Sequence, residues 1–453
     1  MRYFHRLKTL VAGGLRPAQL PVRRTRRAAC DAARFYTGWG FIVLKWSGAF
    51  ILFLLIFGQV YGQTFAEYFQ QANEAYQKKD YNSNVELLEK SIEAGGDHPM
   101  ILYFLARGYA LTGNGTKANE TLNKLADLGI SYNPERDPEF AAIHKLPEFN
   151  RVVERFRANL KPTNISEPAI TITDVSLIPE GIAFDPSDQA FYFGGVKQRK
   201  IIRFKNGKFD DFSSPKDELW SVLGMKVKNG TLWVASTALE GQGKGKSGIF
   251  QYDLKTAKLL NKYILPGENH GLGEVVIASN GTVYATDSVN PGIYSLNQGK
   301  LELFLGPEPF RSPQGACLSE DQKILFVADY SRGIFAIDLP TKKHWKLSRA
   351  PGTTTLAGID GLYCHGKYLI AIQNGVQPNR ILQIETNTEA TGIERVNILE
   401  SNHEVFPEPT LGVIVEDDFY YVGNSMIVPF LENPNVDLKP AVILKLPHGT
   451  RTQ

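Results

Sequence analysis

Cysteine is scarce in this chain of 453 residues, which holds only Cys30, Cys317 and Cys364. No CxxC motif or Cys/His cluster surrounds these residues, so a structural zinc site is not indicated. We expect Cys30 to be lost with an N-terminal signal, and Cys317 and Cys364 to be small buried apolar residues without a disulfide framework. Stability must then come from a packed core.

The sequence also lacks the GxSxG and HExxH signatures of common hydrolases and metalloproteases. The segment EGQGKGKS, residues 240–247, nearly matches a phosphate-binding loop, but its first position is Glu240 rather than Gly. The residues that follow it, IFQY, alternate like a strand, so no helix N-terminus is available to bind phosphate. We expect a basic hairpin loop there instead of a nucleotide site.

A basic surplus is missing from most of the chain. The first 62 residues carry ten of the 50 Lys and Arg but only Asp31 of the 47 acidic residues, which leaves 40 basic and 46 acidic residues beyond them. A general nucleic-acid binder needs a basic face that displaces counterions from phosphate. Nucleic acid is therefore not an expected partner.

An apolar run, AFILFLLIFG, covers residues 49–58 and follows six basic residues between Arg23 and Lys45. Its length of about ten residues is short for a membrane span, and Val60-Tyr61-Gly62 offers a cleavage site before Gln63. Residues 1–62 are therefore predicted to be an export signal, and the mature protein is expected to be periplasmic or secreted. The alternative is that the signal is not cleaved and that residues 41–60 anchor the protein in the membrane. Only in that case would the protein contact a membrane.

Residues 63–160 read as helices that repeat after about 34 residues. Ala72, Tyr76 and Leu88 in the first unit correspond to Ala106, Tyr109 and Leu122 in the second. These small and aromatic positions resemble the packing positions of tetratricopeptide repeats, and two Pro-initiated segments, residues 137–140 and 146–150, are expected to cap the array. Such a domain either binds a protein or peptide partner or serves as a packing spacer.

Residues 168–448 contain short β-rich segments in a pattern that returns every 40 to 50 residues or so. The pattern predicts a mostly β fold, a six-bladed β-propeller preceded by the α-helical domain. A fourth strand is expected in blades one to five, but the chain ends too soon for one in blade six. We expect Ala169-Ile170-Thr171-Ile172 to pair with residues 441–446 and to close the sixth blade, which removes an exposed edge. The six copies are E180-GIAFDPSDQAFYFGG, L223-GMKVKNGTLWVAS, G273-EVVIASNGTVYATD, Q314-GACLSEDQKILFVAD, D360-GLYCHGKYLIAIQN and L411-GVIVEDDFYYVGN.

The first residue of each copy is expected at one mouth of the central channel, and we call these six the rim residues. Oxygen ligands there suit a hard cation such as Ca²⁺, whereas Zn²⁺ would require His or Cys. Asp and Asn also end strands routinely through turn hydrogen bonds, so a purely structural role is the alternative for those at the ends of the second strands. The loops around His403-Glu404 and residues 373–380 are further candidates for substrate contact, or are merely solvated. The rim residues are Glu180, Leu223, Gly273, Gln314, Asp360 and Leu411, with Asp287, Asp329, Asn374 and Asn424 ending the neighbouring second strands.

Three segments, IPEG with FDP at residues 178–186, YATDS at 284–288 and IDG at 359–361, resemble the gluconolactonase, regucalcin and strictosidine-synthase-like propellers. That resemblance implies a divalent metal, usually Ca²⁺, held by a Glu, two Asn and an Asp. The Glu and the Asp fall on Glu180 and Asp360, while the two Asn positions fall on Gly273 and Gln314. Glu274 or His270 is the expected replacement for the missing ligand.

The resemblance predicts a metal-dependent hydrolase of a small lactone or ester, and the N-terminal signal predicts that it is exported. The metal would polarise the carbonyl, and Asp360 or His270 would take a proton from water. The alternative is a non-catalytic binding protein in which the propeller face and the helical repeats hold a peptide, a sugar or a partner protein. Gly273 and Gln314 favour this alternative, because they depart from the metal-binding pattern.

Overall fold

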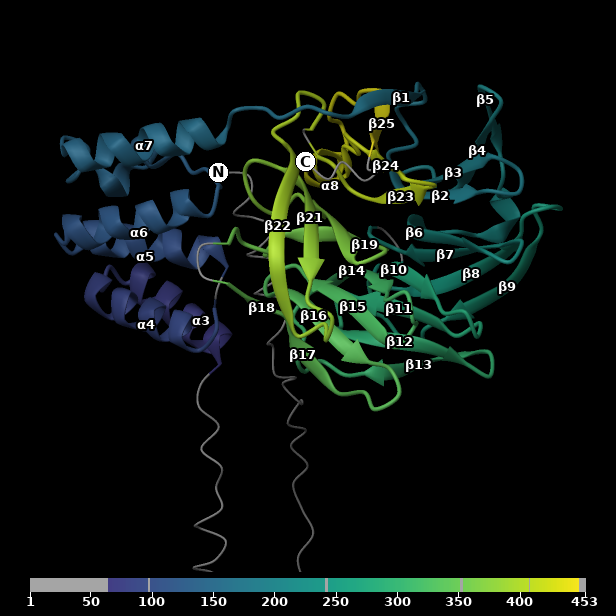
Figure 1. Cartoon of the computed structure of the whole chain (residues 1–453), viewed down its shortest axis with the longest axis horizontal. Helices are drawn as coiled ribbons and strands as arrows, with labels where there is room; N and C mark the ends of the chain where they lie inside the picture. The colour runs from purple at the N-terminus through teal and green to yellow at the C-terminus, as the bar shows by residue number, and fades with distance from the viewer. Residues whose placement is uncertain (1–63, 97, 241–242, 351–352, 407, 448–453) are drawn as a thin grey trace, which may run out of the picture.

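The computed structural model describes residues 64–447, except residues 97, 241–242, 351–352 and 407 (Figure 1). The predicted export signal, residues 1–62, lies outside the described residues. Within the described part, a stack of helices lies against one side of a β-propeller. None of the helices described is long and apolar enough to cross a membrane.

The helical domain contains two helical hairpins and a further helix. The second hairpin begins 34 residues after the first, as the predicted repeat requires. Thr64, Asp80 and Asn114 cap three of the helices by accepting a backbone N–H, and Pro99 begins α5, where a proline costs no hydrogen bond. The helices are α3 (Phe65–Gln77), α4 (Tyr81–Glu93), α5 (Pro99–Leu111), α6 (Gly115–Asp127) and α7 (Pro147–Asn159), with short 3₁₀ turns at Pro134–Arg136 and Pro138–Phe140.

Five of the six predicted packing positions of the repeat are buried, and the sixth, Tyr76, is partly exposed. Ala72, Ala106, Leu88 and Leu122 are each at most 1 % exposed and belong to one hydrophobic cluster. That cluster also contains Val376, which belongs to the propeller. The small helical domain thus gains part of its core from the propeller, which compensates for the little apolar area that two repeats can bury alone.

Six sheets form the propeller, and their innermost strands contact one another in a closed circle, as predicted. A separate apolar cluster lies between each pair of neighbouring blades, because both faces of every sheet are covered. Asn229 and Gly230 both have positive φ angles in the hairpin of blade two. In the hairpin of blade three, Gly281 has a positive φ angle and Asn280 does not. Blade one contains β2 (Pro179–Asp185), β3 (Ala190–Gly195), β4 (Ile201–Lys205) and β5 (Lys208–Asp211); blade two contains β6 (Ser221–Lys228), β7 (Thr231–Thr237), β8 (Ser247–Asp253) and β9 (Leu259–Ile264); blade three contains β10 (Leu272–Ile277), β11 (Val283–Asp287), β12 (Gly292–Asn297) and β13 (Lys300–Leu305). Blade four contains β14 (Pro313–Leu318), β15 (Ile324–Asp329), β16 (Gly333–Asp338) and β17 (His344–Lys346); blade five contains β19 (Ile359–His365), β20 (Tyr368–Gln373), β21 (Arg380–Thr386), β22 (Gly392–Ser401) and the short β18 (Ser348–Arg349); blade six contains β23 (Gly412–Val415), β24 (Asp418–Val422) and β25 (Ala441–Pro447).

The sixth blade is completed by β1 (Glu167–Ile172), which precedes blade one in the sequence. This strand runs antiparallel to β25, with Ile170 opposite Ile443 and Ile172 opposite Ala441. The predicted pairing is therefore confirmed, and the ring closes without leaving β25 as an open edge. The hairpin loop expected at residues 240–247 is also followed by a strand, β8, and not by a helix.

The cysteine prediction was wrong. Cys317 on β14 and Cys364 on β19 form a disulfide that joins the innermost strands of blades four and five. The two residues are 47 positions apart in the chain, so no local spacing motif marks them. Their Cα atoms lie 5.5 Å apart only because the propeller places the two strands side by side.

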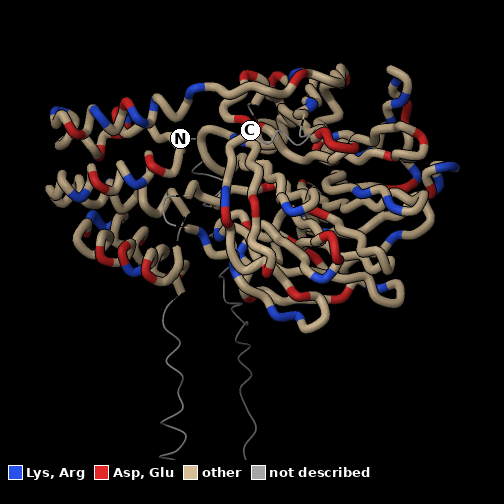
Figure 2. The backbone as a smooth tube through the Cα atoms, in the orientation of Figure 1, with Lys and Arg blue, Asp and Glu red and all other residues tan. Residues whose placement is uncertain are grey.

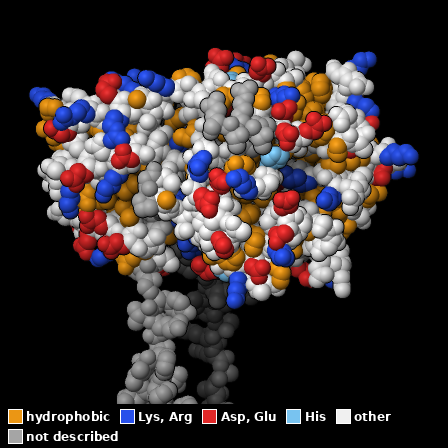
Figure 3. All heavy atoms as spheres, viewed as in Figure 1, with side chains coloured by type: hydrophobic (Ala, Val, Ile, Leu, Met, Phe, Trp, Pro, Cys, Tyr) orange, Lys and Arg blue, Asp and Glu red, His pale blue; other side chains and the backbone are white. Residues whose placement is uncertain are grey.

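Acidic and basic residues are interspersed over both domains along the backbone (Figure 2). The face seen in the space-filling view likewise carries both signs in small groups, with apolar side chains between them (Figure 3). A single extended field of one sign does not cover this face, so electrostatics there act through local pairs.

Candidate functional site

A break in strand pairing marks the start of the innermost strand in five blades. In blades one and five, for example, the register shifts between Pro179 and Gly181 and between Ile359 and Gly361. The rim residues Glu180 and Asp360 lie at these breaks, and the breaks in blades two, three and four include Leu223, Gly273 and Gln314. Because a β-bulge redirects a side chain, the same device orients the rim residues in successive blades.

Glycines beside the rim allow the innermost strands to approach closely. A Cβ atom on Gly181 would lie 1.9 Å from the backbone oxygen of Leu223 in the next blade. Blade three has Glu274 instead of a glycine, and Gly224 of blade two makes room for it: a Cβ on Gly224 would lie 2.6 Å from Glu274 Oε1. The departure from the repeat therefore places a carboxyl group between the innermost strands of blades two and three.

Glu274 is the centre of a charged cluster inside the propeller. Its side chain is only 3 % exposed, and Nζ of Lys226 on β6 lies 4.0 Å from Oε1. Burial raises the pKa of Glu274, the charge of Asp360 raises it further, and the ammonium group of Lys226 opposes the shift. The carboxyl group therefore keeps its proton to a higher pH than an ordinary Glu would.

Tyr363 on β19 links this cluster to the rim. Its ring lies under the ammonium group of Lys226, with Nζ 4.8 Å from the ring centre, and its hydroxyl accepts the N–H of Gly412 at 2.7 Å. Burial, and then the charge of Glu274, raises the pKa of Tyr363 well above its usual value; the charges of Asp360 and Glu180 add to the shift. Three acidic side chains therefore act on one buried phenol.

Asp360 is positioned by a residue of its own blade, and Glu180 by a residue that follows β24 of blade six. Asn374 at the end of β20 donates from Nδ2 to Asp360 Oδ2 at 2.6 Å and to the carbonyl oxygen of Pro409 at 2.9 Å. The hydroxyl of Ser425 donates to Glu180 Oε2 at 3.1 Å. Asn374 therefore holds a rim carboxylate in place, a role for which its position at a strand end gave only a weak indication.

The other strand-end residues hold turns. Asp287 accepts the backbone N–H groups of Gly271, Val289 and Asn290 through one oxygen. Asp329 accepts those of Arg311 and Ser312, and Asn424 accepts that of Val442. These contacts are the turn-forming role that the sequence left open as the alternative.

The predicted metal ligands do not converge as a ligand set. In the described part of the chain, no three His, Cys, Asp or Glu side chains form a group that could hold a metal ion. Gly273 offers no side chain, and the amide nitrogen of Gln314 donates to Ser312 Oγ at 3.1 Å. Nζ of Lys226 lies 4.0 Å from Glu274 Oε1, and an ammonium group beside a ligand oxygen disfavours a divalent cation, so the donors present do not fit a bound Ca²⁺.

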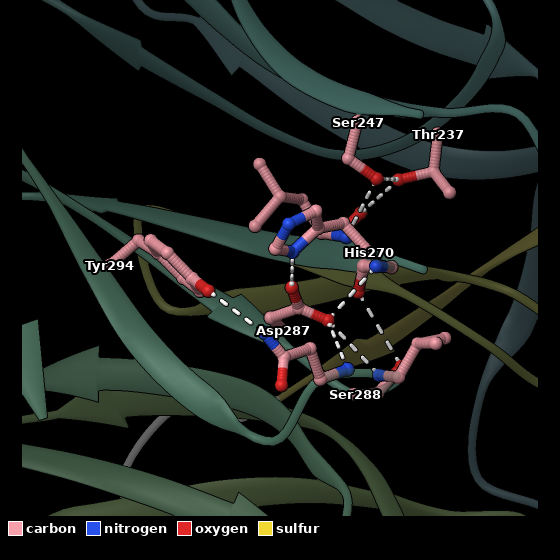
Figure 4. Close-up of polar contacts among 10 residues, drawn as sticks. Thr237, Ser247, His270, Asp287, Ser288 and Tyr294 are labelled. Atoms are coloured by element: carbon pink, nitrogen blue, oxygen red, sulfur yellow. Dashed lines mark hydrogen bonds and ion pairs between the residues drawn. The ribbon is translucent and has the colours of Figure 1, made fainter. Parts of the chain in front are cut away.

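His270 lies in a separate cluster on the loop before β10 (Figure 4). Its Nδ1 is 2.7 Å from Asp287 Oδ2, and its ring packs edge-on against Tyr294. The loop is held to blade two, since the N–H of His270 donates to the carbonyl of Gly245 and Leu272 contacts both Ser247 and Thr237. The structure thus pairs His270 with Asp287, whereas Asp360 belongs to the channel cluster.

Arg380 corrects one expectation about the loop candidates. Its side chain is fully buried, and burial lowers its pKa to about 10. Nε donates to Gln373 Oε1, and Nη1 donates to the carbonyl groups of Leu128 and Gly129 in the helical domain. Arg380 therefore joins the two domains instead of contacting a substrate at the rim.

Sequence reasoning missed Lys226 and Tyr363. Each lies three positions after a rim residue, Leu223 and Asp360 respectively, within the first strand of its blade. Because the two residues lie at equivalent positions of two blades, the repeat alignment could have indicated them as site residues. The inward direction of their side chains depends on the bulges, which simple alternation along a strand does not predict.

No family model matches this chain. No curated protein matches it either. Solved structures similar to it include a gluconolactonase from Xanthomonas campestris, with 13% identity, 63% of this chain and 99% of that chain covered, and a TM-score of 0.44. A virginiamycin B lyase from Staphylococcus aureus, solved with quinupristin, has 14% identity, 62% and 99% coverage and a TM-score of 0.44.

A luciferin-regenerating enzyme has 15% identity, 62% and 95% coverage and a TM-score of 0.42. At such identities the likeness concerns the fold alone. The arrangement of its own strands and helices makes the described part of the chain a six-bladed β-propeller preceded by tetratricopeptide-like helices.

Proposed function

We propose that this chain is a hydrolase of small lactones or esters and that the reaction takes place in the propeller channel. The observation that carries the proposal is the buried carboxyl group of Glu274, which has a raised pKa, an ammonium group 4.0 Å away and a second carboxylate, Asp360, acting on it. Two carboxyl groups in different environments can divide the roles of acid and base. Lys226 retains 26 % exposure of its side chain, so a small polar molecule can reach it.

In the proposed reaction, Asp360 accepts a proton from a water molecule that attacks the carbonyl carbon. The ammonium group of Lys226 stabilises the negative charge that develops on the carbonyl oxygen. When the carbon–oxygen bond of the ring or ester breaks, the protonated carboxyl group of Glu274 gives its proton to the leaving oxygen. The products are a carboxylic acid and an alcohol, which are one molecule if the substrate is a lactone.

The test is hydrolysis of a panel of lactones and aryl esters by the purified protein. We expect Asp360→Asn to lower kcat/KM by about 10²- to 10⁴-fold, because the variant cannot accept the proton. Asp417→Asn is the matched control, since Asp417 lies at the exposed turn between β23 and β24. Equal activity of Asp360→Asn and Asp417→Asn would contradict the proposal.

The same assay addresses the Ca²⁺ that the resemblance predicts. Because Lys226 supplies the positive charge in the proposed reaction, activity should be the same before and after dialysis against a chelator. A loss of activity that Ca²⁺ restores would instead support the metal-dependent mechanism and would remove the proposed role of Lys226.

We further propose that the protein works outside the cytoplasm. The disulfide between Cys317 and Cys364 supports this location, because such bonds persist in oxidising compartments. Protein isolated from its natural host in the presence of a thiol-alkylating reagent should carry no label on either residue until it is reduced and unfolded. Labelling of both residues before reduction would place the protein in a reducing compartment.

A non-catalytic binding protein is the second candidate. It is favoured by Gly273, which contributes no side chain to the rim, and by the engagement of the Gln314 amide with Ser312. Under this hypothesis the charged channel binds a polar ligand without turnover. The absence of hydrolysis across the panel, together with saturable binding of one of its members that Asp360→Asn weakens, would support this candidate.

A further inference from the structure

A cavity of about 500 Å³ lies between the helical domain and the propeller. Met100 and Tyr103 of α5, Tyr132, Val153 of α7 and Val376 of the propeller are among the residues that line it. This volume is in the range of sites that hold small organic molecules. The cavity shares no lining residue with the charged pair Lys226 and Glu274.

The walls of the cavity suit an aromatic molecule. The rings of Tyr103 and Tyr132 are stacked, with their centres 4.3 Å apart and their planes at 12°. Phe156 of α7 supports the Tyr132 ring edge-on, so the stacked pair forms a rigid apolar wall. Flat aromatic surfaces contribute a large contact area while losing little conformational freedom on binding.

The polar groups of the cavity define what else the ligand needs. The hydroxyl of Tyr103 donates to Asp137 Oδ2 at 3.0 Å, whereas that of Tyr132 has no hydrogen-bond partner among the described residues. Burial raises the pKa of Tyr132, so its hydroxyl keeps its proton and is available to donate. Arg157 at the cavity is already paired with Glu135 and Glu154. A neutral ligand with one hydrogen-bond acceptor therefore matches these groups better than a charged one.

The cavity also adjoins a segment that reaches the channel. Gly375, Val376 and Gln377 line the cavity, and the carbonyl of Gln377 accepts the N–H of Ser131 at 2.6 Å. The preceding residue is Asn374, whose side chain donates to Asp360. An occupant of the cavity would therefore contact the segment that positions a rim carboxylate.

We propose that this interdomain cavity is a binding site for a neutral aromatic molecule that carries a carbonyl or similar hydrogen-bond acceptor. The ring packs against Tyr103 and Tyr132, and the acceptor receives the hydroxyl proton of Tyr132. The proposal goes beyond the hydrolase activity and does not depend on it, because binding is measured without turnover.

The test uses the neutral fluorophore prodan, a naphthalene with a ketone, titrated into the full-length protein. We expect saturable binding with one site per chain and a blue-shifted emission. Tyr132→Phe, which removes only the hydroxyl, should weaken binding about five-fold. Tyr81→Phe on α4 is the matched control, and it should bind prodan like the parent protein.

A second variant and a second measurement locate the site. Met100→Trp should fill the cavity and abolish binding, and hydrogen exchange should slow on prodan binding in residues 130–135 and 374–377. Unchanged affinity in both Tyr132→Phe and Met100→Trp would overturn the proposal. Protection confined to the innermost strands of blades two and three would also overturn it, because the fluorophore would then occupy the channel.

Discussion

Replacing Ile172 by Asp should unfold the propeller under conditions in which the parent protein is stable. Ile172 is 1 % exposed and belongs to the apolar cluster between blades six and one. A charge there has no partner, which costs about 3–5 kcal/mol of the free energy of unfolding. Ile172 lies on β1, the strand that closes the ring, so the destabilisation should spread to the whole propeller. The midpoint of thermal unfolding should fall by on the order of 10 °C.

Thr171→Asp provides the matched control for this experiment. Thr171 precedes Ile172 on the same strand, but its side chain is exposed. The same charge should therefore change the free energy of unfolding by less than about 0.5 kcal/mol. Urea denaturation followed by circular dichroism measures both variants, and equal midpoints would show that β1 is not part of the cooperative structure.

Replacing Lys226 by Met should make the stability of the protein fall steeply as the pH rises. Burial raises the pKa of Glu274, so this group favours the folded state most at low pH and loses that contribution as the pH rises through its raised pKa. Without the ammonium group the pKa rises further, and ionisation in the folded protein becomes more costly. We expect the variant to lose roughly 1–3 kcal/mol relative to the parent at pH 8 and much less at pH 5.

The double variant Lys226→Met/Glu274→Gln isolates the interaction. Its second change removes the titrating group, so the extra pH dependence of the single variant should disappear. Lys228→Met, two positions further along β6, is the matched control for losing one lysine from this strand. A Lys226→Met variant whose loss of stability is the same at pH 5 and pH 8 would show that Lys226 does not interact with Glu274 in solution.

Much of the fold could be predicted because its signals repeat. The pairs Ala72/Ala106 and Leu88/Leu122 marked the helical repeat, and each of these four residues is buried in the structure. The pairing of β1 with β25 followed from counting strands, since blade six lacked one and a closed ring must not leave an edge. These predictions need only local sequence patterns and the rule that an unpaired edge strand is disfavoured.

The candidate site was harder to predict because its members come from different blades. Glu180 and Asp360 were found through their equivalent positions in the repeat. The approach of Lys226 to Glu274, and the position of Tyr363 beneath the same ammonium group, depend on how the strands of blades two, three and five approach one another. The distances between these strands cannot be predicted from the spacing of residues in the sequence.

By itself, then, the sequence determined the type and order of the elements and the number of blades, because alternation and repetition act over a few residues at a time. The tertiary structure decided which side chains meet. It joined Cys317 to Cys364, buried Arg380 between the domains, and placed Lys226 beside Glu274. These contacts depend on distances between residues far apart in the chain, and such distances exist only once the ring of blades has closed.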